Sequence, residues 1–208
     1  MLFVISLSIV AYLLGSAPWG LVIAKVFCGV DPRLEGSRNT GATNVARLCG
    51  FGFGVATLFC DIFKGALPVL LAMLDTDKAA AISTVGFFAV LGHVFSCFLG
   101  FRGGKAVATS IGVFLPLAFL PTLASCLVCI AVIALTRLVS LGSLCLLGSL
   151  PITLFVSGEC SFIPLALALF VVVAYRHREN IARLKAGTEN RLTISRSGQA
   201  KNGKKTDA

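Results

Sequence analysis

The sequence is short of charged residues, and this shortage excludes an ordinary water-soluble domain. Only 13% of its 208 residues are Asp, Glu, Lys or Arg, whereas 57% are hydrophobic and the mean hydropathy is +0.94. Soluble domains usually contain about 25% charged residues. A chain of this composition needs lipid around it to shield its apolar side chains, so we expect a membrane protein.

Acidic residues and histidines are particularly scarce, and the motifs that several enzyme classes build from them are missing. The sequence has nine acidic residues and two histidines. It lacks the paired-Asp motif of metal-dependent phosphatidyltransferases, and Phe98 and Ala182 replace the aspartate of an H-x-x-x-x-D motif after His93 and His177. The G-x-x-x-x-G-K-[ST] spacing of nucleotide-binding loops is also absent, which disfavours an NTPase.

The eight cysteines lack the paired spacing of a disulfide framework. Most of them lie in or beside apolar runs, where reduced thiols are expected. Cys126 and Cys129 form a C-x-x-C, but the sequence offers no second Cys or His pair beside them. This spacing therefore indicates packing and not a zinc or redox site.

Long apolar runs recur along the whole chain. A helix needs about 20 residues to cross a hydrocarbon core of about 30 Å, so we predict one all-α domain, 1–193, that is a polytopic membrane bundle of about seven transmembrane helices. The expected spans lie near 2–24, 53–74, 79–100, 106–120, 121–136, 139–157 and 161–175. Because several of these runs are short, a five-span arrangement with re-entrant helices is the alternative.

The net charge of +9 is concentrated in the loops and the tail. If the N-terminus is outside, seven spans leave one face with only Lys78 as a basic residue, beside Asp75, Asp77 and Glu159. Because positive residues collect on the cytoplasmic side, we expect an inner-membrane protein with a cytoplasmic C-terminus and cytoplasmic active-site loops. The charge thus reflects topology and anion binding, and we expect no nucleic-acid partner. The segment 194–208 is expected to be a disordered basic tail.

The loop after the first apolar run has the composition of an anion cradle. In Gly36-Ser-Arg-Asn-Thr-Gly41, glycines allow backbone N–H groups to approach an oxyanion, while Ser37, Asn39 and the nearby Arg47 add further donors. A Gly-rich turn whose Asn and Ser side chains cap helices explains the same pattern equally well.

A second polar stretch, Arg102-Gly-Gly-Lys105, precedes another apolar run. If a helix starts at about Lys105, its free N–H groups, its dipole and the Lys and Arg charges all point at the same anion. His93 lies at the end of the preceding span. There a hydrogen-bonded structural histidine is at least as reasonable as a catalytic one.

A third polar stretch, Tyr175 to Asn180, follows the last apolar run. His177 and Asn180 are three residues apart and share a helix face, from which they can bind or deprotonate a hydroxyl group. For Arg176 and Arg178, a basic collar that snorkels to the membrane surface is the favoured interpretation.

Two charged residues lie inside a predicted span. Asp61 and Lys64 are three residues apart, and charges within a membrane are costly enough to require pairing or a function. We therefore expect an internal ion pair that supports the site. Ser140, at a short turn after Arg137, is a further candidate for an anion contact or an ordinary boundary residue.

These motifs together resemble one known family, the bacterial acyl-phosphate:glycerol-3-phosphate acyltransferases called the PlsY family. The resemblance extends from Gly15 to about Arg191. It rests on Gly15-Ser16-x-Pro18-x-Gly20, Asp31-x-Arg33-x-x-Gly36-Ser37-x-Asn39-x-Gly41-Ala42-Thr43-Asn44-Val45-x-Arg47, Gly92-His93, Gly103-Gly104-Lys105 and Tyr175 to Asn180.

The resemblance implies an enzyme that moves a fatty acyl group from acyl phosphate to the 1-hydroxyl of glycerol 3-phosphate. The products are lysophosphatidate and phosphate, in the first acylation of bacterial phospholipid synthesis. The resemblance implies no cofactor, no metal and no use of acyl-CoA. It places the enzyme in membrane lipid, with its basic face as a candidate docking surface for a soluble acyl-phosphate synthase.

The resemblance also implies two groups of site residues. The substrate-binding group comprises Ser37, Asn39, Thr43, Asn44, Arg47, Gly103, Gly104 and Lys105. The catalytic group comprises Lys105, Ser140, His177 and Asn180. Because an acyl phosphate is already activated, orienting two anions and stabilising developing charge is sufficient chemistry. The sequence leaves open whether His177 or a phosphate oxygen accepts the hydroxyl proton.

Three departures from the family pattern occur, and one other function competes with it. Arg38 and Ala106 stand where glycine is common, and Ser96-Cys97 replaces a more usual Pro-Val. Arg38 either adds a phosphate contact or points to solvent, whereas the other two departures affect only local helix geometry. A small transporter for an organic anion would also need a basic pocket, but the sequence shows no internal repeat and its polar groups gather on one face.

Overall fold

The computed structural model describes residues 2–192, and every regular element in this part of the chain is a helix. The helices are α1 (Leu2–Ser16), α2 (Trp19–Cys28), α3 (Ala42–Cys49), α4 (Phe51–Met73), α5 (Ala79–Val94), α6 (Val107–Leu117), α7 (Phe119–Thr136), α8 (Val139–Val156), α9 (Ile163–Arg176) and α10 (Arg178–Lys185). Two 3-10 turns, Cys97–Leu99 and Cys160–Phe162, follow α5 and precede α9. The predicted tail, 194–208, lies outside the described residues.

Five segments are long and apolar enough to cross a membrane. They are Leu2–Cys28, Phe51–Met73, Ala79–Leu99, Phe119–Thr136 and Val139–Val156. A sixth span results if the last two helices, which are bent by 67° at His177, cross the membrane as one unit. These segments confirm the prediction of an all-α, polytopic membrane protein.

The helix in the predicted span 106–120 is shorter than expected. α6 has 11 residues, which extend over about 16 Å at 1.5 Å per residue. It starts only at Val107 because Ala106 has a left-handed backbone with a φ of 59°, and the extended Ala118 separates it from α7. By length, α6 therefore covers about half of a 30 Å hydrocarbon core.

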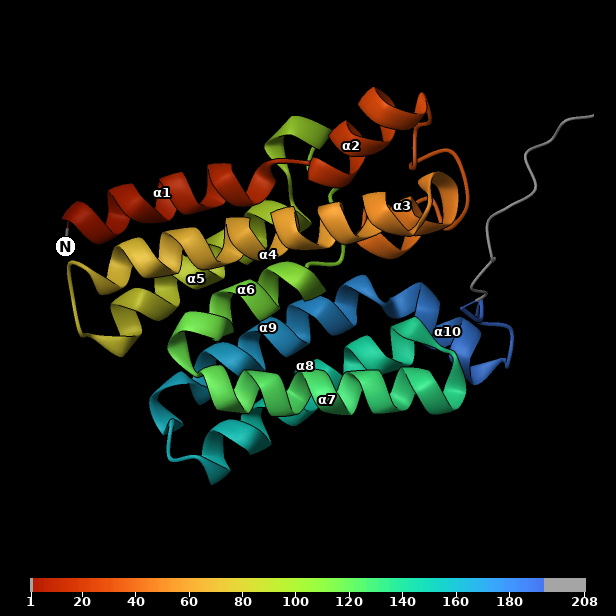
Figure 1. Ribbon diagram of the computed structural model, residues 1–208. Coiled ribbons are helices and arrows are strands. Elements are labelled where there is room, and N and C mark those ends of the chain that lie inside the picture. Colours follow the sequence, from red (N-terminus) through yellow and green to blue (C-terminus); the bar gives the residue numbers. More distant parts are fainter. Residues whose placement is uncertain (1, 193–208) are drawn as a thin grey trace, which may run out of the picture.

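Close helix contacts at glycine hold the first half of the bundle together. α1 packs along α5, and α4 packs along α6 (Figure 1). A Cβ on Gly15 would lie 2.0 Å from the carbonyl oxygen of Ala89, and one on Gly112 would lie 2.0 Å from that of Ile62. Such contacts let backbones approach and gain dispersion energy, which replaces the hydrophobic effect between helices in lipid.

The interior and the surface are both apolar. Phe114, Leu147 and Leu169 are fully buried in the main core. On the outside, Leu135 and Val156 have exposed fractions of 86% and 80%. Because no aqueous protein would leave so many large apolar side chains exposed, this surface fits a lipid environment.

The loops that carry the predicted site residues meet at one end of the bundle. Figure 1 shows α3, α10 and the turn between α7 and α8 at this end, and the α4–α5 and α8–α9 connections at the other end. After α10 the chain turns back, and the N–H of Leu192 donates to the carbonyl oxygen of Arg137 over 2.7 Å. Residues far apart in the sequence are thereby brought to one place.

Candidate functional site

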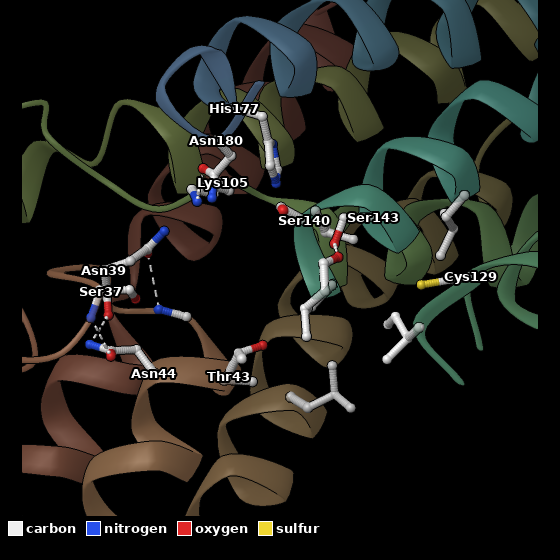
Figure 2. A pocket seen from close by; sticks show the side chains of 18 of the residues that line it. Ser37, Asn39, Thr43, Asn44, Lys105, Cys129, Ser140, Ser143, His177 and Asn180 are labelled. Carbon is white, nitrogen blue, oxygen red and sulfur yellow. Dashed lines mark hydrogen bonds between the residues drawn. The ribbon is translucent and has the colours of Figure 1, made fainter. Parts of the chain in front are cut away.

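A cavity of about 480 Å³ opens at this end of the bundle. Its polar wall contains most of the residues that the sequence predicted, and they come from α3, the loop before it, the α5–α6 loop, α8 and the junction of α9 with α10. These residues are Ser37, Asn39, Thr43, Asn44, Arg47, Lys105, Ser140, His177 and Asn180. In Figure 2, the group around Lys105 and Asn180 lies across the cavity from the group around Ser37 and Thr43.

The rest of the cavity is apolar and extends between the helices. Its lining includes Leu58 and Ile62 of α4, Ile111 of α6, and Ile130 and Ile133 of α7. One continuous space thus has donors and positive charge at one end and hydrocarbon walls at the other. A ligand with an anionic head and an apolar chain matches both ends.

Lys105 is a partly buried cation on the polar wall. Its ammonium donates a hydrogen bond to the Oδ1 atom of Asn180. Burial lowers the pKa of Lys105 to about 8, and the nearby carboxylate of Glu189 partly opposes this decrease. The side chain is therefore still mostly protonated at pH 7 and can bind an anion.

Glu189 is a member of the cavity lining that the sequence reasoning missed. Its carboxylate accepts hydrogen bonds from Asn180 Nδ2 over 2.6 Å and from Arg183 Nε over 2.7 Å. Burial raises the pKa of Glu189, but the hydrogen bonds from Asn180 and Arg183 outweigh burial and leave the pKa below its usual value. The only signal in the sequence is that Glu189 is the one acidic residue between 181 and 192.

His177 is held at the junction of α9 and α10 with one ring nitrogen left free. Its Nδ1 atom lies 2.8 Å from the carbonyl oxygen of Val173. Because a carbonyl can only accept, we assign the proton of the neutral ring to Nδ1. Burial and the charge of Lys105 lower the pKa of His177 to about 4. At pH 7 the ring is neutral, so Nε2 can accept a proton or a hydrogen bond.

Ser140 offers a buried hydroxyl without a partner. It lies in the first turn of α8 and is 7% exposed. The hydroxyl is close to the carboxylate of Glu189, but no hydrogen bond of acceptable geometry forms to any described residue. A buried polar atom in this state fits a site that a ligand oxygen completes.

Asn44 shapes the first loop from inside. Its Oδ1 atom accepts the N–H of Ser37 over 2.8 Å, and its Nδ2 atom donates to the carbonyl oxygen of Asn39 over 2.9 Å and to that of Pro32 over 2.9 Å. Arg47 Nη1 also donates to Asn44 Oδ1 over 3.4 Å. The amide of Asn44 is therefore used within the loop and by Arg47, which leaves the hydroxyl of Ser37 and the other donors of the Arg47 guanidinium to meet a ligand. Figure 2 shows the contact between Asn44 and Ser37 at the edge of the cavity.

Gly103 and Gly104 are the two predicted site residues that do not line this cavity. Their N–H groups donate to the carbonyl oxygens of Val94 and His93 over 3.0 and 3.1 Å. Their own carbonyl oxygens accept hydrogen bonds from Arg176 over 2.7 and 3.2 Å. The two glycines thus fix the backbone before Lys105, and Arg176 points inward where a surface collar was expected.

Two other predictions can be compared directly with the structure. The expected ion pair is confirmed, because Lys64 Nζ lies 2.7 Å from Asp61 Oδ1 and both side chains are buried. Arg38, one of the departures from the family pattern, is exposed and does not line the cavity. Within residues 2–192, no cluster of three His, Cys, Asp or Glu residues suits a metal ion.

Comparison with known proteins identifies the family. Residues 5–187 match the family described as glycerol-3-phosphate acyltransferase. The glycerol-3-phosphate acyltransferase of Desulfovibrio desulfuricans is 64% identical over 179 residues, which cover 86% of this chain and 80% of that protein.

Two crystal structures of PlsY, an integral membrane glycerol 3-phosphate acyltransferase, have the same fold. The glycerol 3-phosphate form is 41% identical with a TM-score of 0.88, and the match covers 91% of this chain and 96% of that chain. The lysophosphatidic acid form is 39% identical with a TM-score of 0.86, covering 91% and 95%. The chain therefore belongs to the PlsY family of integral-membrane glycerol-3-phosphate acyltransferases.

Proposed function

We propose that this protein transfers a fatty acyl group from acyl phosphate to the 1-hydroxyl of glycerol 3-phosphate. The observation that supports this most strongly is one continuous cavity with Lys105 and the Ser140 hydroxyl at one end and apolar helix faces at the other. The two PlsY structures are named for glycerol 3-phosphate and lysophosphatidic acid, which are the acceptor and the product of this reaction.

The chemistry needs orientation and charge stabilisation more than a protein nucleophile. The 1-hydroxyl oxygen bonds to the acyl carbonyl carbon, the bond from this carbon to the bridging phosphate oxygen breaks, and phosphate leaves. Because phosphate is a good leaving group, holding the two anions in register accounts for much of the acceleration. Lys105, Arg47 and Ser37 are the groups that we assign to the phosphates.

The remaining polar groups surround the reacting centre in this proposal. Nε2 of neutral His177 accepts the hydrogen of the attacking hydroxyl, and Asn180 and Ser140 orient the acceptor and the developing oxyanion. Thr43 adds a hydroxyl on the opposite wall, while Asn39 and Asn44 shape its loop. Gly103 and Gly104 act through the backbone that precedes Lys105.

We place the protein in the bacterial inner membrane with its N-terminus outside and the cavity on the cytoplasmic side. Support comes from the basic residues that flank the cavity end and from the rule that such residues stay in the cytoplasm. Acyl phosphate then reaches the site from the cytoplasm or from lipid. The same basic face is where a soluble acyl-phosphate synthase would dock.

Product analysis with two donors tests the proposal. Purified protein in detergent receives glycerol 3-phosphate with either palmitoyl phosphate or palmitoyl-CoA, and mass spectrometry follows lysophosphatidate. We expect product from palmitoyl phosphate and none from palmitoyl-CoA. Product from palmitoyl-CoA alone would overturn the donor assignment, and no product from either donor in folded protein would favour the anion-transporter alternative, which vesicle uptake then tests.

A further inference from the structure

Four buried polar side chains form a network at the wall of the cavity, which Asp61 and His93 line. Asp61 and Lys64 come from α4, His93 from α5 and Thr109 from the first turn of α6, and each is at most 8% exposed. Lys64 Nζ contacts Asp61 and also donates to the carbonyl oxygen of Ala17 over 2.8 Å, at the break between α1 and α2. The network therefore joins the helices on which the first two site loops are built.

His93 is the central member of this network. Its Nδ1 atom lies 2.9 Å from the hydroxyl oxygen of Thr109 and 3.8 Å from Oδ1 of Asp61. Ionisable groups inside a membrane are costly, so their presence points to a task that apolar packing cannot perform. The histidine brings a hydrogen-bonding group next to Gly104, the residue before Lys105.

The imidazole of His93 also contacts the segment that carries Lys105. A Cβ on Gly104 would lie 2.3 Å from Nε2 of His93, so only glycine lets the backbone lie this close to the ring. The N–H of Gly104 donates to the carbonyl oxygen of His93 over 3.1 Å. On its other side, the same segment is held by Arg176.

We propose that His93, oriented by its hydrogen bond to Thr109, is a positioning residue for Lys105. It fixes the backbone of Gly104 and thereby keeps the ammonium of Lys105 on the polar wall of the cavity, beside Asn180. The effect of this positioning on catalysis rests on the function proposed above, whereas its effect on Lys105 itself does not.

The test replaces Thr109 by valine, which keeps the shape but removes the hydrogen-bonding partner of His93. Thr122→Val is the matched control, because this buried hydroxyl bonds over 2.7 Å only to Ala118 at the start of its own helix and lies outside the cavity. Two experiments are made on folded protein. The first measures the rate at which an amine-reactive reagent modifies Lys105, and the second measures kcat and KM for glycerol 3-phosphate.

We expect Thr109→Val to change the modification rate of Lys105 and to raise KM for glycerol 3-phosphate about tenfold, since small displacements of a binding group are costly. Thr122→Val should change neither. His93→Leu should act like Thr109→Val, and His93→Asn, which places an amide near the Nδ1 position, should recover part of the loss. If Thr109→Val does not fold, Thr109→Ala provides the same comparison.

The two proposals fail in different ways. Variants that lose thermal stability but keep the modification rate of Lys105 and KM at the wild-type values would show that the network is only structural, and the positioning role would be wrong. A wild-type protein that makes no acylated product, but whose Lys105 modification responds to Thr109→Val, would overturn the proposed function and leave the positioning role standing.

Discussion

Of the cations assigned to phosphate binding, Lys105 is more buried than Arg47. Its removal should therefore lower the activity more. A charge-assisted hydrogen bond is stronger where water is excluded, and removing one such donor from an active site typically costs a factor of about 100 to 1,000 in rate. We predict that Lys105→Ala lowers kcat/KM by at least about 100-fold and that Ser37→Ala and Arg47→Ala also remove most activity. Steady-state kinetics measures the loss.

Cys160→Ser is the control for these three variants. Cys160 is exposed and lies in the connection between α8 and α9, which Figure 1 shows at the opposite end of the bundle. Its replacement should therefore leave the kinetics unchanged. Full activity of Lys105→Ala would remove Lys105 from the site.

The pKa of Lys105 predicts how substrate affinity depends on pH. Burial lowers this pKa to about 8, so in the free enzyme the lysine loses its proton as the pH rises through about 8. Only the protonated form attracts the phosphate dianion, and affinity should therefore begin to fall as the pH approaches 8 and decrease more steeply above pH 8, by up to about tenfold per pH unit. Calorimetric titration with glycerol 3-phosphate between pH 7 and 9.5 measures this.

The same titration with Lys105→Ala separates this effect from other ionisations. The variant should bind weakly at every pH and lack the decrease above pH 8. An affinity of the wild-type protein that stays constant up to pH 9.5 would show that protonation of Lys105 does not control binding.

At the scale of single residues, sequence spacing predicted many of the site residues but few of the hydrogen bonds between them. Asp61 and Lys64 were predictable as a pair because they are three positions apart on one helix. Glu189 was not predictable, because it reaches Asn180 only after the chain reverses at Gly187, which has a φ of 70°. The hydrogen bond from the N–H of Gly103 to the end of α5 was also not predictable, because no sequence pattern shows such a contact.

At the scale of elements, the residue before α6, Ala106, has a strained backbone and directly follows Lys105. Ala106 adopts a left-handed backbone with φ of 59°, which costs an L-amino acid about 1–2 kcal/mol relative to glycine. Glycine loses some of this advantage through its more flexible unfolded state. We predict that Ala106→Gly raises the free energy of unfolding by up to about 1 kcal/mol, seen as a higher thermal midpoint in detergent.

Ala134→Gly is the matched control for this change. Ala134 lies inside α7, where a glycine lowers helix stability by about 1 kcal/mol, so the thermal midpoint should fall. If Ala106→Gly lowers the midpoint as much as Ala134→Gly does, the left-handed conformation at Ala106 carries no strain.

The positions of the long helices were predictable because hydrophobic length is set by the bilayer itself. Their ends were less predictable. The predicted run 106–120 was uncharged and mostly apolar, but the backbone turn at Ala106, the break at Ala118 and the contact of Gly112 with α4 define a short helix. These features depend on tertiary packing, which the hydropathy of a single segment does not contain.

At the scale of the whole molecule, the charge distribution predicts the orientation in the membrane. Cys160 lies exposed in the α8–α9 connection, and Arg102 lies exposed in the α5–α6 loop near the cavity end. We predict that a variant with Cys160 as its only cysteine reacts with a membrane-impermeant maleimide on the outer face of the inner membrane in spheroplasts. A cysteine-free variant that then receives Arg102→Cys should react only after the membrane is permeabilised.

The reverse labelling pattern would place the cavity on the outer side and would contradict the cytoplasmic assignment. Such a result would leave the fold and the cavity unchanged, because neither depends on orientation. It would instead remove the cytoplasm as the source of acyl phosphate and of a docking synthase.

The central claim is that one cavity holds both an acyl phosphate and glycerol 3-phosphate through an anion site that depends on Lys105. The most direct measurement is phosphate release by purified protein given palmitoyl phosphate, with and without glycerol 3-phosphate, for the wild type and Lys105→Ala. We predict that wild-type release requires glycerol 3-phosphate, matches lysophosphatidate formation one to one, and is lost in Lys105→Ala while the variant remains folded. Release that is independent of glycerol 3-phosphate, or equal in Lys105→Ala, would contradict the account.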